Sequence, residues 1–354
     1  MKKVVILIII VLLLFIPVTA NNDIPEVLTK EHNFSTPNID TNSKVTDSLM
    51  PENIFKYFFS SLKKSILEIP VTLSTLIVII FLSSVTGIFV KSTSLSKIPE
   101  YCSVFAVILL CFNLLEPLIN TVSIYLENYI SFMTSMISTL TVILSSSGNA
   151  STALTTSSSA AFAIGITQVC SLNLILPLAK TLICLSVIST LSQTLDLSGI
   201  INFIRSTCAW GLGALFAVFG GVHTAAVHIS SSADSLVLRS IRFSAARLIP
   251  VAGNMISESM RTVASGIKII KTTAGGIGIA YILYSLIPVI TAILAVKMII
   301  LVSIFADKLI GKKLYTQFLE GVNASINILM GICIFSSVSG IIIFAVFMNT
   351  VTSL

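Results

Sequence analysis

Few residues in this chain have the types and spacing that chemistry requires. His223 and His228 are five positions apart, so on a helix they would lie on different faces, and Asp234 is the nearest acid. We therefore expect no metal site there and interpret these residues as polar groups at a membrane edge. The six cysteines all lie in apolar segments without a CxxC pair, which favours packing in helices over disulfides or metal binding.

Catalytic motifs are equally sparse. Ser60 and Lys63 form a Ser-x-x-Lys, but none of its usual partner motifs follows in the sequence. Gly211 and Gly213 lack the third glycine and the strand-to-helix context of a dinucleotide site, and neither a phosphate-binding loop nor an HExxH sequence occurs. The sequence thus predicts a protein that is not an enzyme and that needs no cofactor.

Charged residues inside apolar segments are more informative, because an ionisable group in a membrane is costly and usually faces the protein interior. Lys297 is the clearest case, since it lies nine residues after Pro288 and nine before Ala306, where the apolar run ends. Four further candidates could instead lie at the ends of spans: Glu116, Lys180, Asp196 and Arg205.

The highest concentration of charge lies between His223 and Gly276, here called the basic segment. Its six basic residues, against two acidic ones, are Arg239, Arg242, Arg247, Arg261, Lys268 and Lys271. In its second half an apolar stripe recurs at steps of four and three, comprising Ile256, Met260, Val263, Ile267 and Ile270. The opposite face carries Glu258, Arg261, Ser265 and Lys268. This pattern predicts two amphipathic helices that are broken between Pro250 and Gly253.

Two interpretations of the basic segment remain open. Its helices could lie in the membrane interface, with arginine and lysine side chains reaching the lipid headgroups. Alternatively they form a re-entrant hairpin whose polar faces line an aqueous path, because irregular backbone at membrane depth requires protein or a cavity around it. In both cases the candidate lining or interfacial residues are Arg239, Arg242, Arg247, Glu258, Arg261, Ser265 and Lys268. The candidate helix breaks are Pro250, Gly253 and Pro288.

Composition places this chain in a membrane. Hydrophobic residues make up 55% of the 354 positions and charged residues only 10%, and the mean hydropathy is +1.01. A soluble core cannot hide so much apolar surface. The net charge of +6 could suggest nucleic acid, but the basic residues adjoin apolar segments, so membrane topology explains them better and no nucleic-acid partner is expected.

The fold class expected is all-α, a polytopic helical membrane protein. Residues 1–20 match a cleavable signal peptide, although an uncleaved anchor is the alternative. The remaining predicted units are a polar arm ending in an amphipathic helix (21–69), N-terminal transmembrane helices (70–221), the basic amphipathic pair (222–276) and C-terminal transmembrane helices (277–354).

The number of spans is expected to be six to eight. The positive-inside tendency is satisfied if either Leu126 to Leu144 or Thr181 to Leu195 does not cross; the alternative is that the basic segment is not a simple loop. The run from Ile277 to Ala306 is too long for one upright span, and it is therefore either a tilted, kinked helix or a hairpin at Pro288. The other candidates are Pro70 to Val90, Tyr101 to Ile119, Ala161 to Ala179, Ile201 to Gly221 and Ile326 to Met348.

The order of these features resembles a known family. The most specific residues are Ala233-Asp234-Ser235, Arg242-Phe243, Leu248 to Gly253 and Gly275-Gly276, and with the spans around them they resemble the stage III sporulation protein AE family. The resemblance implies a multi-pass protein of the mother-cell membrane around the forespore. It further implies a channel-like or secretion-like assembly with other products of the stage III operon and a forespore membrane partner, supporting late forespore gene expression. No catalytic residues are carried over.

Two functions from different classes therefore compete. The first is a membrane subunit of a transenvelope complex, in contact with lipids and with partner proteins, and with homo-oligomerisation possible. The second is a stand-alone secondary transporter whose broken helices, at Pro250, Gly253 and Pro288, would bind a solute. A membrane-bound hydrolase is disfavoured because no nucleophile is paired with a base in the sequence.

Overall fold

The structure is a computed structural model in which residues 51–67, 69–89, 97–146, 150–191, 197–215, 217, 253–310 and 315–349 are described. Its elements are α4 (Pro51–Leu67), α5 (Ile69–Phe89), α6 (Lys97–Ser146), α7 (Ala150–Gln168), the π-helix η1 (Val169–Ile175), α8 (Leu176–Leu191), α10 (Gly253–Ile310) and α11 (Thr316–Asn349), and residues 198–215 are also helical. The expected signal peptide, the arm before residue 51, and Arg239, Arg242, Arg247 and Pro250 lie outside the described residues.

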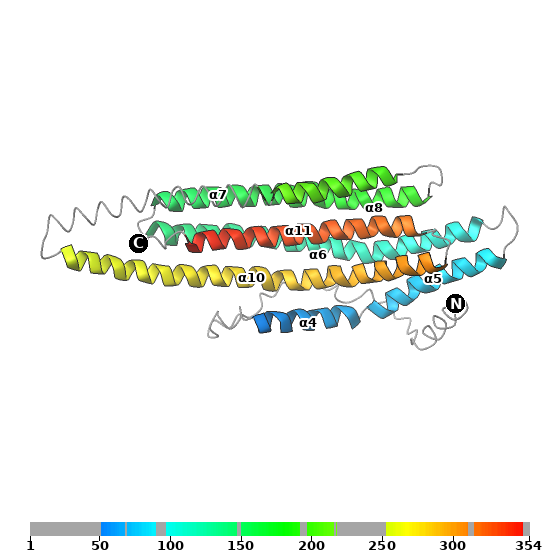
Figure 1. Ribbon diagram of the computed structural model, residues 1–354, viewed down its shortest axis with the longest axis horizontal. Coiled ribbons are helices and arrows are strands. Elements are labelled where there is room, and N and C mark those ends of the chain that lie inside the picture. The colour runs from blue at the N-terminus through cyan, green and yellow to red at the C-terminus, as the bar shows by residue number, and fades with distance from the viewer. Residues whose placement is uncertain are drawn as a thin grey trace.

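Within the described ranges, four helical stretches are long and apolar enough to cross a membrane: Tyr101–Ser146, Ala153–Leu191, Thr273–Leu309 and Thr316–Met348. About 20 residues suffice for one crossing, so each of them exceeds a single span. The described chain is thus all-helical and polytopic in character, as the sequence predicts. The helices lie side by side along the long axis of the molecule (Figure 1).

Neighbouring candidate spans belong to one continuous helix in the structure. Tyr101 to Ile119 and Leu126 to Leu144 are both part of α6, which continues through Pro117. The hydroxyl of Thr121 donates to the Pro117 carbonyl at 2.9 Å. Of the alternatives that the sequence left open, the structure therefore has the one in which Leu126 to Leu144 is not a separate span. The stretch of small residues from Ser145 to Ala160 is also largely helical, since α7 begins at Ala150.

The helix α10 passes through Pro288 without ending. Of the two alternatives for the run from Ile277 to Ala306, the structure has the single helix and not the hairpin. A proline inside a helix costs roughly 3 kcal/mol or more, which tertiary packing must offset. Local support comes from Thr291, whose hydroxyl donates to the Pro288 carbonyl at 2.9 Å and lies 2.9 Å from the hydroxyl of Ser61 in α4.

The helix α11 forms the centre of the bundle and packs most extensively against α10 and α8. Small residues allow this close approach: a β-carbon at Gly321 would collide with the side chain of Ser186 in α8, and one at Gly278 of α10 would collide with Phe344. Interhelical packing in membranes uses small residues in this way, because lipid tails leave no hydrophobic driving force between helices.

Hydrogen bonds between helices fix the register of the bundle. The Tyr125 hydroxyl lies 2.6 Å from the Ser337 hydroxyl, and Tyr315 donates to Ser103 at 2.6 Å, so α6 runs parallel to α11 with a constant offset of 212 positions. Gln317 donates to Ser189 at 2.6 Å and Ser325 donates to the Ala179 carbonyl at 2.8 Å, so α8 runs antiparallel to α11.

The amphipathic helix predicted before the first span is present as α4. It lies beside α10 (Figure 1), with the rings of Tyr57 and Tyr284 5.2 Å apart between centroids. Its placement on a membrane surface remains a prediction.

Candidate functional site

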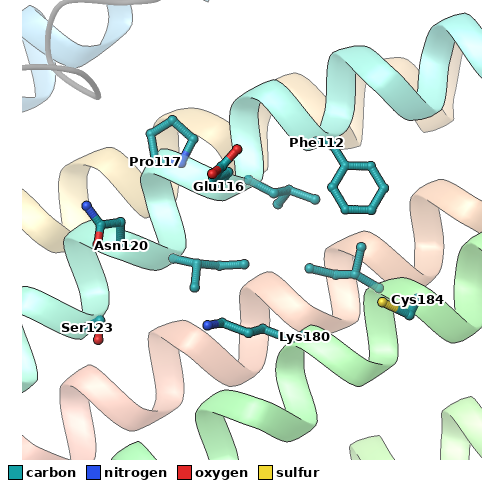
Figure 2. Close-up of a pocket in the computed structure, with 10 residues that line it drawn as sticks. Phe112, Glu116, Pro117, Asn120, Ser123, Lys180 and Cys184 are labelled. Carbon is teal, nitrogen blue, oxygen red and sulfur yellow. The ribbon is translucent and has the colours of Figure 1, made fainter.

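A cavity of about 710 Å³ lies between α6 and α8 near the middle of the bundle. Its lining residues are Phe112, Leu115, Glu116, Pro117, Ile119, Asn120, Ser123, Lys180, Ile183 and Cys184. The polar residues of α6 in this set recur at steps of four and three, so they share one face of the helix. Figure 2 shows that α6 and α8 form opposite walls of the cavity.

The position of α8 in this wall is set by α11. Ser325 of α11 bonds the carbonyl of Ala179, the residue directly before Lys180. On the other side of Lys180, the hydroxyl of Thr181 bonds back to the Pro177 carbonyl at 2.9 Å. The turn that carries Lys180 is therefore held against the bundle while its side chain remains exposed.

The cavity carries one acid and one base. Glu116 projects from α6 and Lys180 from α8, and both side chains are exposed (Figure 2). Among the described residues neither one forms a hydrogen bond or an ion pair. Opposite charges in a largely apolar helical bundle are therefore available to a bound molecule.

A hydrogen bond between α10 and α11 lies at the same depth in the bundle as Glu116 and Lys180. The ammonium group of Lys297 in α10 donates to Oδ1 of Asn327 in α11 at 2.7 Å, and Lys297 is partly buried. Asn327 is two residues after Ser325, or about 3 Å along the axis, so Lys180 and Lys297 flank the same part of α11. The constant offset between α6 and α11 places Glu116 at the depth of Ile328. Glu116, Lys180 and Lys297 therefore form one layer across the bundle, here called the polar layer.

The exposed face of α6 changes character at this layer. Before it, the exposed residues on this face are Tyr101, Phe105, Leu109 and Phe112. From it onward they are Glu116, Asn120, Glu127, Ser131, Thr134 and Ser138. On the apolar side of the layer α10 likewise exposes Met298, Leu301, Phe305 and Leu309.

An aromatic residue marks the same depth. Trp210 is 79% exposed, and a β-carbon at Gly331 would lie 3.2 Å from Leu212, so the 198–215 helix packs against α11 close to Asn327. Tryptophan is enriched at the boundary between hydrocarbon and water. On this face of α6 the polar layer thus separates apolar exposed side chains from polar ones. Elsewhere the division is not kept, since Ile334 of α11 is exposed on the polar side and the exposed ion pair of Lys308 and Glu320 lies on the apolar side.

Comparison with known proteins decides the family. The sequence model of the family described as "Stage III sporulation protein AE (spore_III_AE)" matches residues 36–351, which is most of the chain. This chain belongs to the stage III sporulation protein AE family. The resemblance drawn from the sequence alone is confirmed.

A relative within the stage III sporulation protein AE family shows how far the likeness extends. The protein named "Stage III sporulation protein AE" of Bacillus subtilis (strain 168) is 26% identical over 240 residues, which cover 67% of this chain and 60% of that protein. The match thus spans about three fifths of the length of the relative. No solved structure matches the chain.

The residues proposed from the sequence fall into three groups in this family member. Lys297 is placed in the bundle with a defined partner, Asn327. Glu258, Arg261, Ser265 and Lys268 lie on α10, whose helix begins at Gly253 and is continuous into the apolar run. Arg239, Arg242, Arg247 and Pro250 lie outside the described part of the chain, so the helix break between Pro250 and Gly253 stays a prediction.

The cavity itself was not predicted from the sequence. Glu116 and Lys180 were candidates for charges inside the membrane, with a position at a span end as the alternative. Cys184 was interpreted as a packing residue, and Asn120 and Ser123 received no role. A signal was present: polar residues at positions 116, 120, 123 and 127 follow helical spacing within an apolar segment. What the sequence does not show is that α8 lies opposite this face.

Proposed function

We propose that this chain is a membrane subunit of a channel-like or secretion-like stage III sporulation assembly. Membership of the family carries the proposal, and the family implies a role in stage III sporulation. Four long apolar helices support a multi-pass membrane location. The specific location we propose is the mother-cell membrane around the forespore, where the assembly supports late forespore gene expression.

The proposed partners are other products of the stage III operon and a protein of the forespore membrane. Homo-oligomerisation is part of the proposal, since the polar face of α6 includes Glu127 and Ser131, which are exposed in the single chain. An ionisable group such as Glu127 is costly in lipid, so a protein or aqueous neighbour beside it would lower the free energy.

We propose that the basic segment lines or borders the path of the assembly. The residues concerned are Arg239, Arg242, Arg247, Glu258, Arg261, Ser265 and Lys268. Support comes from α10, because its continuity connects positions 253–276 directly to a membrane-crossing helix. Thiol scanning along positions 234–271 with a membrane-impermeant reagent tests this: labelling with helical periodicity on the polar face supports a lining role, and uniform labelling contradicts it.

A stand-alone transporter is the second candidate, and the volume of the cavity is compatible with it. Its volume of about 710 Å³ falls within the ~300–1,000 Å³ that is typical of small-molecule sites. The charges of Glu116 and Lys180 could orient a zwitterionic solute.

Affinity purification from sporulating cells separates these functions. A complex subunit should be recovered with other envelope proteins, and its deletion should abolish late forespore gene expression. Recovery as a lone monomer or dimer, stabilised against heat by an added solute, would overturn the proposed assembly and favour the transporter.

A further inference from the structure

The cavity between α6 and α8 has two chemically different ends. Phe112, Leu115 and Ile183 form an apolar part, whereas Asn120 and Ser123 lie one and two turns beyond Glu116 on the polar side. Because these residues follow one face of α6, the change from apolar to polar runs along the helix axis. A molecule that fills the cavity must therefore be amphipathic, with its apolar part on the Phe112 side.

Charge restricts that molecule further. The ligand meets a carboxylate on one wall and an ammonium on the other, and neither has a partner among the described residues. A lysine binds phosphate as a point charge, and a carboxylate accepts hydrogen bonds from a primary ammonium group. A headgroup that contains both a phosphate and a primary amine satisfies the two walls together.

From these observations we infer that the cavity binds a phospholipid with a phosphoethanolamine headgroup. Lys180 contacts the phosphate and Glu116 contacts the amine. The acyl chains follow the exposed apolar residues Phe105, Leu109 and Phe112 along α6, on the same face as Glu116. Asn120 and Ser123 complete the polar end of the site.

The depth of the site agrees with a lipid headgroup. The polar layer lies where the exposed face of α6 changes from apolar to polar, and Trp210 lies close to the same depth on the 198–215 helix. Tryptophan and lysine at such a boundary anchor a protein at the headgroup region. A headgroup beside Glu116 and Lys180 has polar side chains around its charges, and its acyl chains lie beside Phe105, Leu109 and Phe112.

A small soluble solute fits the geometry less well. Sites for such ligands usually bury most of the ligand surface, whereas Glu116 and Lys180 are both exposed and the apolar wall continues outside the cavity as Leu109 and Phe105. This inference concerns lipid binding alone and does not depend on the sporulation assembly.

Retention of lipid by the purified protein tests the inference. The full chain is reconstituted in nanodiscs that contain equal parts of phosphatidylethanolamine, phosphatidylglycerol and phosphatidylcholine. Lipids that remain bound after transfer to a mild detergent are then counted by native mass spectrometry. The wild type should retain phosphatidylethanolamine over the other two by roughly tenfold, because a charge-assisted hydrogen bond to the primary amine distinguishes it.

Single-residue variants test the proposed contacts of Glu116 with the amine and of Lys180 with the phosphate. Glu116→Gln should abolish the preference for phosphatidylethanolamine, and Lys180→Gln should lower retention of all three lipids. Cys184→Trp fills the cavity from α8 and should have the same effect as Lys180→Gln without changing any charge. Lys63→Gln and Glu52→Gln, both at exposed positions of α4, are matched controls that should behave as the wild type.

Two results would overturn the inference. One is equal lipid retention by the wild type, Lys180→Gln and the folded Cys184→Trp variant, with helix content checked by circular dichroism. The other is displacement of the lipid by soluble phosphoethanolamine at matched concentration, which would identify a small solute as the ligand. Either result leaves the proposed sporulation role untouched, since that role is tested by co-purification.

Discussion

The hydrogen bond from Lys297 to Asn327 gives a partly buried ammonium group its acceptor. Replacing Asn327 by Leu removes the acceptor but keeps the charge, which should destabilise the protein by about 1–3 kcal/mol. Replacing Lys297 by Met as well removes the stranded charge, so the double variant should be more stable than Asn327→Leu alone. Unfolding in mixed micelles, followed by circular dichroism, measures this cycle. Strictly additive effects would show that the pair is not coupled.

Gly321 is the position where a side chain is least tolerated between α8 and α11. Its β-carbon would collide with Ser186, so Gly321→Leu should destabilise the bundle by roughly 1–3 kcal/mol or more. Gly165 on α7 is the matched control, because nothing lies within 4 Å of its β-carbon position. Gly165→Leu should be neutral or slightly stabilising, since leucine favours helix more than glycine does. Equal melting temperatures for the two variants would contradict the close packing.

At the scale of elements, the contact between α4 and α10 should depend on pH. Burial of Tyr57, and secondarily its proximity to Tyr284, raises the pKa of Tyr57 above its ordinary value of 10.0. The folded state therefore holds the phenolic proton more tightly than the unfolded state. This contribution to stability is complete below the ordinary pKa, and it is lost as the pH rises from there through the raised pKa of the folded protein.

The change that tests this contact is Tyr57→Phe, which cannot ionise. Between about pH 8 and about pH 10.5 the melting temperature of the wild type should fall further than that of the variant. Because the other tyrosines are common to both proteins, the difference between them isolates Tyr57. Identical pH profiles would show that the ring is not buried against α10 in solution.

The continuity of α10 predicts on which sides of the membrane its two ends lie. Ser265 and Lys308 are separated by 43 positions on one helix, or about 65 Å, so they should lie on opposite sides of the membrane. In a background without cysteines, Ser265→Cys and Lys308→Cys are treated with an impermeant maleimide on intact cells. One variant should react directly and the other only after permeabilisation. Reaction of both from the same side would restore the hairpin at Pro288.

The lengths of α6 and α10 show which structural features could be predicted from the sequence and which could not. Apolar runs and helical periodicity were sufficient to identify an all-helical membrane protein and its family. The ends of the helices could not be predicted in the same way. Pro117 and Pro288 are local signals for a helix end, whereas the continuity of α6 and α10 depends on packing against α11 and α4. The same limitation concealed the cavity. Periodicity places Glu116 and Asn120 on one face of α6, but only the tertiary arrangement brings Lys180 opposite them.

At the scale of the whole molecule, the two sides of the polar layer differ in the side chains that they expose. One side carries Leu109 of α6 and Met298 of α10, and the other carries Glu127 and Ser131 of α6. Leu109 and Ser131 share a face but lie 22 positions apart, or about 33 Å, which is comparable to the hydrocarbon thickness of about 30 Å. The two positions therefore cannot both lie at the centre of the bilayer.

Spin labels at these positions should consequently report different surroundings. In nanodiscs, a label at Leu109 should be relaxed mainly by dissolved oxygen, which concentrates in hydrocarbon. A label at Ser131 should be relaxed mainly by a water-soluble nickel chelate. Phe305 on α10 is the control for the apolar side and should follow Leu109, because its exposed side chain lies at a comparable distance on the same side of the polar layer. If Ser131 instead follows Leu109, the polar face of α6 lies in hydrocarbon, and the layer of Glu116, Lys180 and Lys297 is not the membrane boundary.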